Sequence, residues 1–161
     1  MKNLMLLLLI PMMFGLAQTA TAQSKTKAEK AFSKELNKVL AKSTQHDTGY
    51  EGVMSIDTPF AISKAGILSV TVRYTTDSAV KRVRLAAPVR GIKEVLYDLY
   101  LILEYATDVV TVYESENSNG AFKEIGKGNR FRVGAPLPEN AVYKKRVQHA
   151  LDKVNTHYKN L

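Results

Sequence analysis

The strongest alternation of hydrophobic and polar positions lies in the middle of the chain, at Lys93–Glu114. In its first half every second residue from Val95 to Tyr105 is apolar, which places six apolar side chains on one face of a strand. The second half, after Asp108, is rich in the β-branched and aromatic residues that strands favour. We therefore predict a central antiparallel hairpin. The residues at 92–105 also fit the spacing of an amphipathic helix, which is the alternative.

A second hairpin is predicted just before this stretch. Residues 67–74 and 80–87 each alternate between apolar and polar positions, and the connector between them is short and polar. Their apolar faces match only in an even register, which places Arg73 directly opposite Arg82, with Arg84 nearby. Like charges directly opposite one another destabilise a sheet, so this cluster is expected to meet an anion.

Shorter strands are expected on either side of these hairpins. Pro59 indicates a bend or a sheet edge, and the GKGN stretch at 126–129 is expected to be a hairpin turn because it lacks the spacing of a phosphate loop. The four expected strands are Val53–Ile56, Phe60–Ile62, Phe122–Ile125 and Arg130–Val133.

Helices are predicted on both sides of the strands. At 23–42 a narrow apolar stripe lies among six lysines, with a capping box formed by Thr26 and Glu29. The stripe is expected to pack on the sheet, and the alternative is a helix that lies on an anionic membrane. From Pro138-Glu139 to the C-terminus, apolar residues recur at helical spacing.

These elements predict an α+β fold with an N-terminal helix, an antiparallel β-meander of about six or seven strands, and a long C-terminal amphipathic helix packed on the sheet. The order of the elements resembles the pleckstrin-homology-like fold in outline. This resemblance covers element order alone and implies a domain that binds ligands or peptides, without specifying which. A β-cup or a cystatin-like sheet with a packed helix is the alternative.

The first 22 residues have the features of an export signal. Lys2 supplies a positive start, 4–17 is apolar, and 20–22 form an A-x-A cleavage motif. The apolar part has 14 residues, fewer than the roughly 20 that a membrane-spanning helix needs. We therefore predict an exported protein, periplasmic or secreted, that is cleaved near Ala22-Gln23. Residues 23–161 would then be a single α+β domain without a transmembrane span.

The chain carries a formal net charge of +8, or +7 once Lys2 is removed with the signal. Outside the cytoplasm this charge suits an anionic ligand, an acidic glycan or an acidic protein, and nucleic acid is not an expected partner. Charge that only keeps the protein soluble is the alternative. The sequence has no cysteine, which excludes disulfides, thiol nucleophiles and thiolate metal sites.

No motif in the sequence indicates a catalytic reaction. A G-x-S-x-G elbow is missing, and His46, His149 and His157 lack the spacing of a helical zinc pair. Asp98 and Glu104 would lie about 20 Å apart on one predicted strand, too far for a glycosidase pair. No catalytic residue, cofactor or metal is therefore predicted.

The sequence instead predicts a binding site. The arginine cluster, with Arg132 on an adjoining strand, is expected to bind an anionic group. The alternative is that its guanidinium groups extend into solvent or pair with Asp98 or Glu104. Tyrosines of the central stretch are suited to line a sugar or lipid site. The candidate ligand-binding residues are Arg73, Arg82, Arg84, Arg132, Tyr97 and Tyr100.

Two functions fit these features. The leading hypothesis is an exported, non-catalytic binding or protein-interaction domain that recognises an anionic group through a basic sheet face. The alternative is a small-molecule or lipid-binding cup between the sheet and the C-terminal helix, with hydrolytic activity as an option. The cup would need an enclosed apolar cavity into which Tyr97, Tyr100 or Asp98 points.

Overall fold

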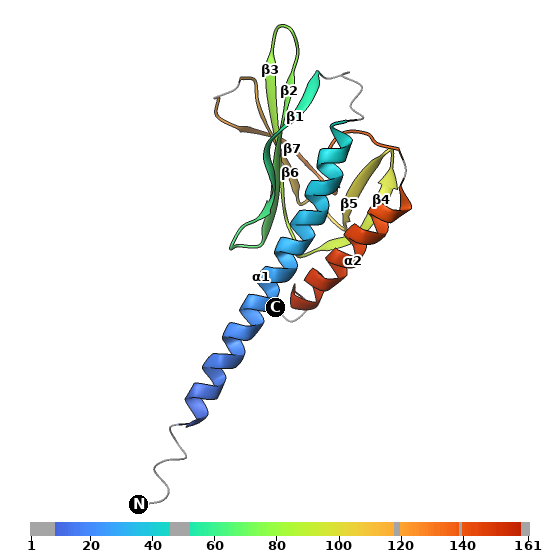
Figure 1. The fold of residues 1–161 in the computed structure, drawn as a ribbon. Helices are drawn as coiled ribbons and strands as arrows, with labels where there is room; N and C mark the ends of the chain where they lie inside the picture. The colour runs from blue at the N-terminus through green and yellow to red at the C-terminus, as the bar shows by residue number, and fades with distance from the viewer. Residues whose placement is uncertain (1–8, 46–51, 118–119, 139, 159–161) are drawn as a thin grey trace, which may run out of the picture.

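The computed structural model of the protein describes residues 9–45, 52–117, 120–138 and 140–158, in which two helices pack against eight antiparallel strands (Figure 1). The predicted α+β class is therefore confirmed. The helices are α1 (Leu9–Ser43) and α2 (Ala141–Tyr158). The strands are β1 (Val53–Ile62), β2 (Ile67–Thr75), β3 (Val80–Pro88), β4 (Ile92–Asp98), β5 (Tyr100–Tyr105), β6 (Val110–Ser115), β7 (Lys123–Gly128) and β8 (Arg130–Arg132).

The larger sheet has the strand order β1-β2-β3-β6-β7. The β2–β3 hairpin has the predicted register, with Arg73 opposite Arg82 and Val72 opposite Val83. Because successive side chains point to opposite faces, the arginines lie on one face of this sheet and the valines on the other.

β1 is one bent edge strand rather than the two pieces that we predicted. Its register with β2 shifts twice, at Asp57 and between Thr58 and Ala61, which includes the position of Pro59. β-bulges of this kind bend a strand and change the direction of its side chains. The bend expected at Pro59 is therefore present, but the strand continues through it.

The central stretch is divided between two sheets, which corrects the predicted central hairpin. Its first half forms a tight hairpin of β4 and β5 around Leu99, whereas its second half, β6, pairs with β3 and β7. Leu99 has a φ of 61°, the left-handed conformation that lets the chain reverse there, and is 63% exposed. The strand conformation predicted within 92–105 is correct, and the helical alternative is wrong.

The GKGN stretch is not the hairpin turn that we predicted. Gly126 and Gly128 belong to β7 and pair with Val112 and Val110 of β6. The chain then crosses at Asn129 into the smaller sheet, where β8 pairs with β5 in the order β4-β5-β8. The edge of the larger sheet is thus connected directly to an edge of the smaller one.

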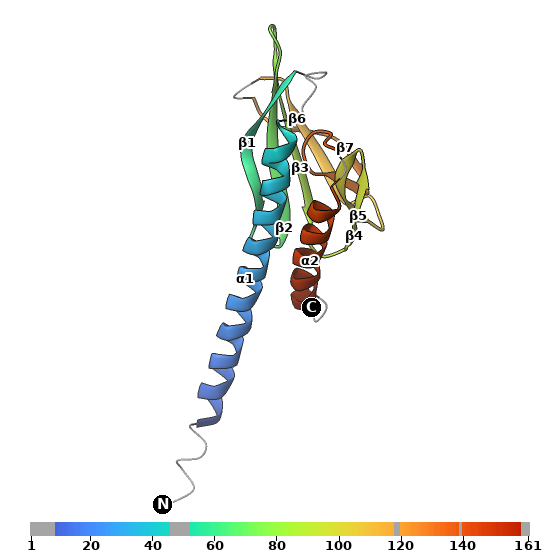
Figure 2. The same ribbon diagram turned by 45° about the vertical axis from the view of Figure 1, so that its right-hand side comes forward.

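α1 packs along the larger sheet and is longer than the predicted helix (Figures 1 and 2). Phe32, Leu36 and Leu40 of its apolar stripe are fully buried, so this stripe is not available to a membrane surface. The helix is continuous through Thr26, whose hydroxyl donates to the Ala22 carbonyl at 3.1 Å, so the predicted capping box is not a helix start. The N-terminal half of α1 projects beyond the domain in both views.

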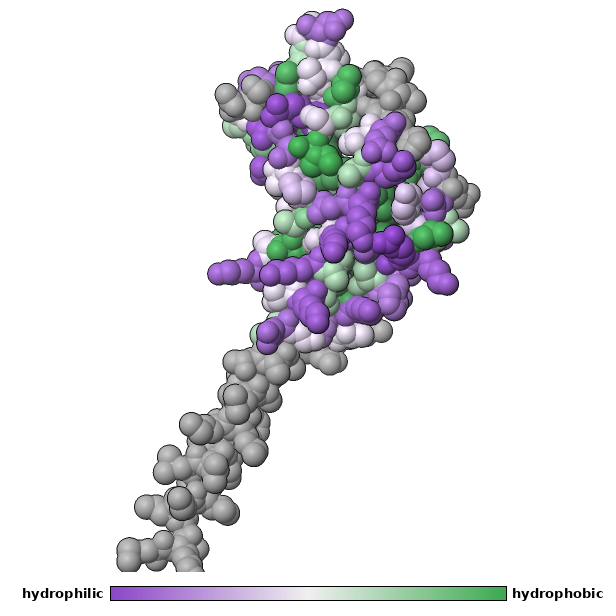
Figure 3. All heavy atoms as spheres, in the orientation of Figure 1, coloured by the Kyte–Doolittle hydropathy of each residue, from purple (hydrophilic) through white to green (hydrophobic). Residues whose placement is uncertain are grey.

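Among the residues that the structure describes, neither helix is long and apolar enough to cross a membrane. In the view of Figure 3, hydrophilic side chains cover much of the exposed faces of the helices, and smaller hydrophobic patches interrupt this cover over the upper strands.

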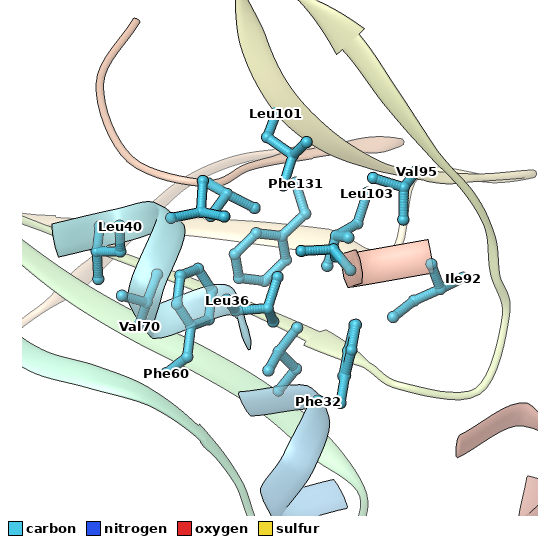
Figure 4. Close-up of a cluster of buried hydrophobic side chains, with 14 of the residues drawn as sticks. Phe32, Leu36, Leu40, Phe60, Val70, Ile92, Val95, Leu101, Leu103 and Phe131 are labelled. Carbon is cyan, nitrogen blue, oxygen red and sulfur yellow. The ribbon is translucent and has the colours of Figure 1, made fainter. Parts of the chain in front are cut away.

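A hydrophobic core joins both helices to both sheets, with side chains from α1, β1, β2, β4, β5 and β8 pointing toward one another (Figure 4). The ring of Phe131, from β8, lies 5.8 Å from that of Phe60, from β1. α2 adds Val147, Leu151 and Val154, which are all fully buried. This core covers only part of the larger sheet, which leaves the remainder of the same face available to form a site.

α2 begins after Asn140 rather than at Pro138-Glu139, of which Glu139 lies outside the described residues. The side chain of Asn140 accepts hydrogen bonds from the N–H groups of Val142 at 3.0 Å and Tyr143 at 3.3 Å. Asn140 is therefore the N-cap of the helix.

Candidate functional site

The arginine pair of the β2–β3 hairpin is neutralised by a carboxylate from the bulge of β1. The side chain of Asp57 accepts hydrogen bonds from Arg73 Nη2 and from Arg82 Nε, each at 2.6 Å. The anion that the pair meets is therefore a protein carboxylate, but it is neither Asp98 nor Glu104. Asp57 is only 13% exposed, which strengthens both contacts by excluding water.

Phe122 covers Arg84, the third arginine of this face. Its ring centroid lies 4.1 Å from the guanidinium carbon of Arg84 and 4.7 Å from that of Arg82, both within cation–π distance. Arg84 Nε also donates to the hydroxyl of Thr71 at 3.4 Å. The basic sheet face predicted from the sequence is thus a connected network in which each arginine already has a partner.

A groove lies on the opposite face of the same sheet. It has a volume of about 450 Å³ and runs between the larger sheet on one side and β8 with the following segment, 134–136, on the other. Alternate residues of β2, β3 and β6 point into it and make its floor apolar. The floor residues are Val70 and Val72, which also belong to the buried core, and Val83, Leu85 and Val112, which are half-buried.

The rim of the groove carries two arginines of β8. Arg130 pairs with Asp98 at 3.6 Å, and both side chains are more than half exposed. The guanidinium of Arg132 lies over the ring of Tyr100, 4.8 Å from its centroid. Among the described residues, no carboxylate lies within 4.0 Å of Arg132. Arg132 is thus a positive charge at the rim that is available to an anionic ligand.

The far side of the rim is neutral and one end of the groove is open. Lys81 and Glu114 form an ion pair of 3.0 Å across β3 and β6. At Gly128, which lines the groove, an added Cβ would meet no atom within 4 Å, and the same holds at Gly126. The absence of a side chain at Gly128 therefore leaves space beside the floor.

The structure divides the predicted site residues into two groups. Arg73, Arg82 and Arg84 lie together on one face of the larger sheet, whereas Arg132 and Tyr100 lie together at the groove on the other side. Arg132 does not adjoin the arginine hairpin, because β8 pairs with β5. Tyr97 is half-buried against the core and belongs to neither group.

Asp57 and the floor residues of the groove are the parts of these sites that the sequence did not reveal. Alternation at 67–87 identified an apolar face, but it did not indicate that the core leaves part of this face uncovered. The expected cup was placed beneath the C-terminal helix, whereas no residue of α2 lines the groove.

In the described part of the chain, the side chains that commonly bind metals do not form a cluster. Within that part, no three His, Asp or Glu residues are close enough to hold a metal ion. His149 lies exposed on α2, and His46 lies outside the described residues.

Burial raises the pKa of Tyr105 and of Tyr158 well above the usual value, and Glu29 contributes to the rise at Tyr158. Neither tyrosine lines the groove.

Comparison of the chain with protein-family models, with curated proteins and with solved structures found no match in any of the three.

Proposed function

We propose that the protein is an exported, non-catalytic binding module whose ligand lies in the groove between the larger sheet and β8. The observation that carries this proposal is an apolar floor beside Arg132, a rim cation with no carboxylate partner among the described residues. A few polar groups around an apolar surface are typical of ligand sites. The ligand therefore has an apolar part for the floor and an anionic group for Arg132.

The position of the predicted cleavage site supports export of a folded domain. The packing contacts described for α1 begin at Lys25, which lies over the ring of Tyr158, and at Ala28. Both follow Ala22-Gln23, so removal of the first residues leaves the core intact. Mass spectrometry of the protein recovered outside the cytoplasm tests the predicted cleavage near Ala22-Gln23. A chain that still carries residues 1–22 would contradict it.

Binding of anilinonaphthalene sulfonate, which combines an apolar ring system with an anion, tests the groove. We expect saturable fluorescence enhancement by the folded protein. Gly128→Leu, which extends a side chain into open space, should abolish it, and Arg132→Ala should weaken it about fivefold. Arg90→Ala is the matched control, because Arg90 is exposed, lies outside the groove and carries the same charge.

The basic sheet face is the competing site in this experiment. If Arg84→Ala weakens dye binding and Arg132→Ala does not, the ligand lies on the opposite face of the sheet and the groove proposal fails. Thermal unfolding of each variant, recorded in parallel, separates lost binding from lost folding.

A further inference from the structure

β8 forms hydrogen bonds with β5 through alternate residues. The Tyr105 N–H donates to the Asn129 carbonyl, and the Val133 N–H donates to the Leu101 carbonyl, each at 2.8 Å. In an antiparallel pair, residues that bond the partner strand alternate with residues whose N–H and C=O groups point away. The odd-numbered residues from 129 to 133 therefore face β5.

The even-numbered residues of β8 present an open strand edge. The N–H and C=O groups of Arg130 and Arg132 point away from β5, and both residues line the groove. No partner for these backbone groups is found among the described residues, where β8 pairs with β5 alone. Unpaired groups in a row are a template for another strand.

The other edge of the smaller sheet is blocked at Val95. The Val95 N–H of β4 donates to Gln148 Oε1 of α2 at 2.9 Å, and Gln148 in turn donates to Asp152 at 2.8 Å. A side chain of α2 thus occupies a position that an added strand would need. Only the β8 edge of the smaller sheet combines unpaired backbone groups with a groove in the described structure.

The pleat of β8 determines which side chains an added strand would present. Phe131 points into the core toward the larger sheet, where its ring meets Phe60, whereas Arg130 and Arg132 lie on the opposite face of the smaller sheet. In a strand paired with β8, alternate side chains would point toward the apolar floor. The others would lie beside Arg130 and Arg132, where acidic residues complement the charge.

We propose that the groove binds an extended peptide segment of a partner protein, which adds to the β4-β5-β8 sheet along β8 and alternates apolar with acidic residues. This inference rests on the proposed function of the groove and specifies its ligand class. Main-chain hydrogen bonds to Arg130 and Arg132 supply affinity, and the floor and the two guanidinium groups supply selectivity.

Fluorescence polarisation with short labelled peptides tests this proposal. A peptide of alternating glutamate and valine should bind, whereas the same peptide with lysine in place of glutamate should not. Arg132→Glu should lower the affinity for the glutamate peptide more than tenfold, because it removes one attractive charge and adds a repulsive one. Arg90→Glu should leave this affinity unchanged. Gly128→Leu, which adds no charge, provides a second variant if Arg132→Glu proves unstable.

Two N-methylated peptides separate strand addition from other docking. One carries the methyl groups on the glutamate nitrogens and the other on the valine nitrogens, with identical side chains. Only one set of nitrogens faces β8, and antiparallel addition places the glutamate set there. We expect one methylated peptide to bind like the parent and the other to lose binding.

The outcomes distinguish this inference from the function on which it rests. Equal effects of the two methylations, with binding retained in both or lost in both, would overturn strand addition. If the dye binds in a way that depends on Arg132 but no peptide binds, the proposal of a peptide ligand is overturned and the groove remains a ligand site. If the wild type self-associates, Gly128→Leu does not, and no peptide binds, the occupant of the groove is a second copy of this chain rather than a partner protein. If neither dye nor peptide responds to the groove variants, both proposals fail.

Discussion

Asn37 of α1 binds both backbone groups of Phe60 in β1. The Phe60 N–H donates to Asn37 Oδ1 at 2.7 Å, and Asn37 Nδ2 donates to the Phe60 carbonyl at 3.0 Å. These bonds fall within the segment where the register of β1 with β2 shifts, so the amide of Asn37 substitutes for a strand partner. One side chain thereby links α1 directly to the backbone of the edge strand β1.

Asn37→Ala is expected to lower the free energy of unfolding by about 1–3 kcal/mol, because the backbone groups of the buried Phe60 lose both partners. Asn37→Asp keeps the acceptor and loses the donor, so its stability should be intermediate. Urea denaturation measures both. A midpoint for Asn37→Ala equal to that of the wild type would show that this contact contributes nothing.

Asp57→Ala is expected to destabilise the protein by about 1–3 kcal/mol, since Arg73 and Arg82 lose the carboxylate that they share. The two guanidinium groups should then bind an added anion. We expect sulfate to raise the melting temperature of Asp57→Ala more than that of the wild type. Sodium chloride at equal ionic strength is the control, and an equal response of both proteins to sulfate would refute this account.

Removal of the hydroxyl should destabilise the protein at Tyr158 but not at Tyr105. Tyr105 is buried and its hydroxyl has no hydrogen-bond partner among the described residues, so Tyr105→Phe should leave stability unchanged or raise it by up to about 1 kcal/mol. The Tyr158 hydroxyl donates to Glu29 at 2.6 Å, so Tyr158→Phe should lower stability by about 1 kcal/mol. Thermal unfolding of the two variants compares them directly, and destabilisation by both would indicate an unrecognised partner for Tyr105.

Glu35 makes the contact between the helices dependent on pH. Burial raises the pKa of Glu35, but hydrogen bonds and charges from Lys38, at 2.6 Å, and Arg146, at 2.7 Å, outweigh it and hold the pKa below 4.5. Because the folded state binds this proton less readily than the unfolded state, Glu35 stabilises the fold above the usual glutamate pKa. This contribution is lost as the pH falls through the folded-state pKa.

The variant Glu35→Gln should therefore be less stable than the wild type at neutral pH, with a difference that narrows as the solution is acidified below 4.5. Glu124→Gln is the matched control, since Glu124 is about half exposed and meets Lys127 only at 3.8 Å. Chemical denaturation across this range measures the difference. A gap between Glu35→Gln and wild type that stays constant with pH would contradict the linkage.

The sequence predicted the strands of the central stretch but not their reversal at Leu99, for a geometric reason. A hairpin centred on Leu99 pairs odd-numbered residues with odd-numbered ones, such as Val95 with Leu103. The alternation therefore continues through the turn, and its pattern is identical to that of one long strand. No glycine, asparagine or proline occupies position 99 to indicate a reversal.

The site was predictable only where pairing is local. The register that joins Arg73 to Arg82 follows from alternation in adjacent strands, and it is correct. The neighbours of Asp57 and Arg132 depend instead on a bulge and on the pairing of β8 with β5, neither of which has a local signal. Whether an apolar strand face is covered likewise depends on where α1 and α2 end.

The hydrogen bond from Tyr158 to Glu29 joins residues 129 positions apart, at opposite ends of the domain. The helix α1 therefore completes its packing only when α2 is available. Until α2 has been synthesised, the apolar stripe of α1 lacks part of its cover, and loop closure over this distance slows the formation of the compact state. A chain that lacks α2 would therefore expose part of the apolar stripe of α1.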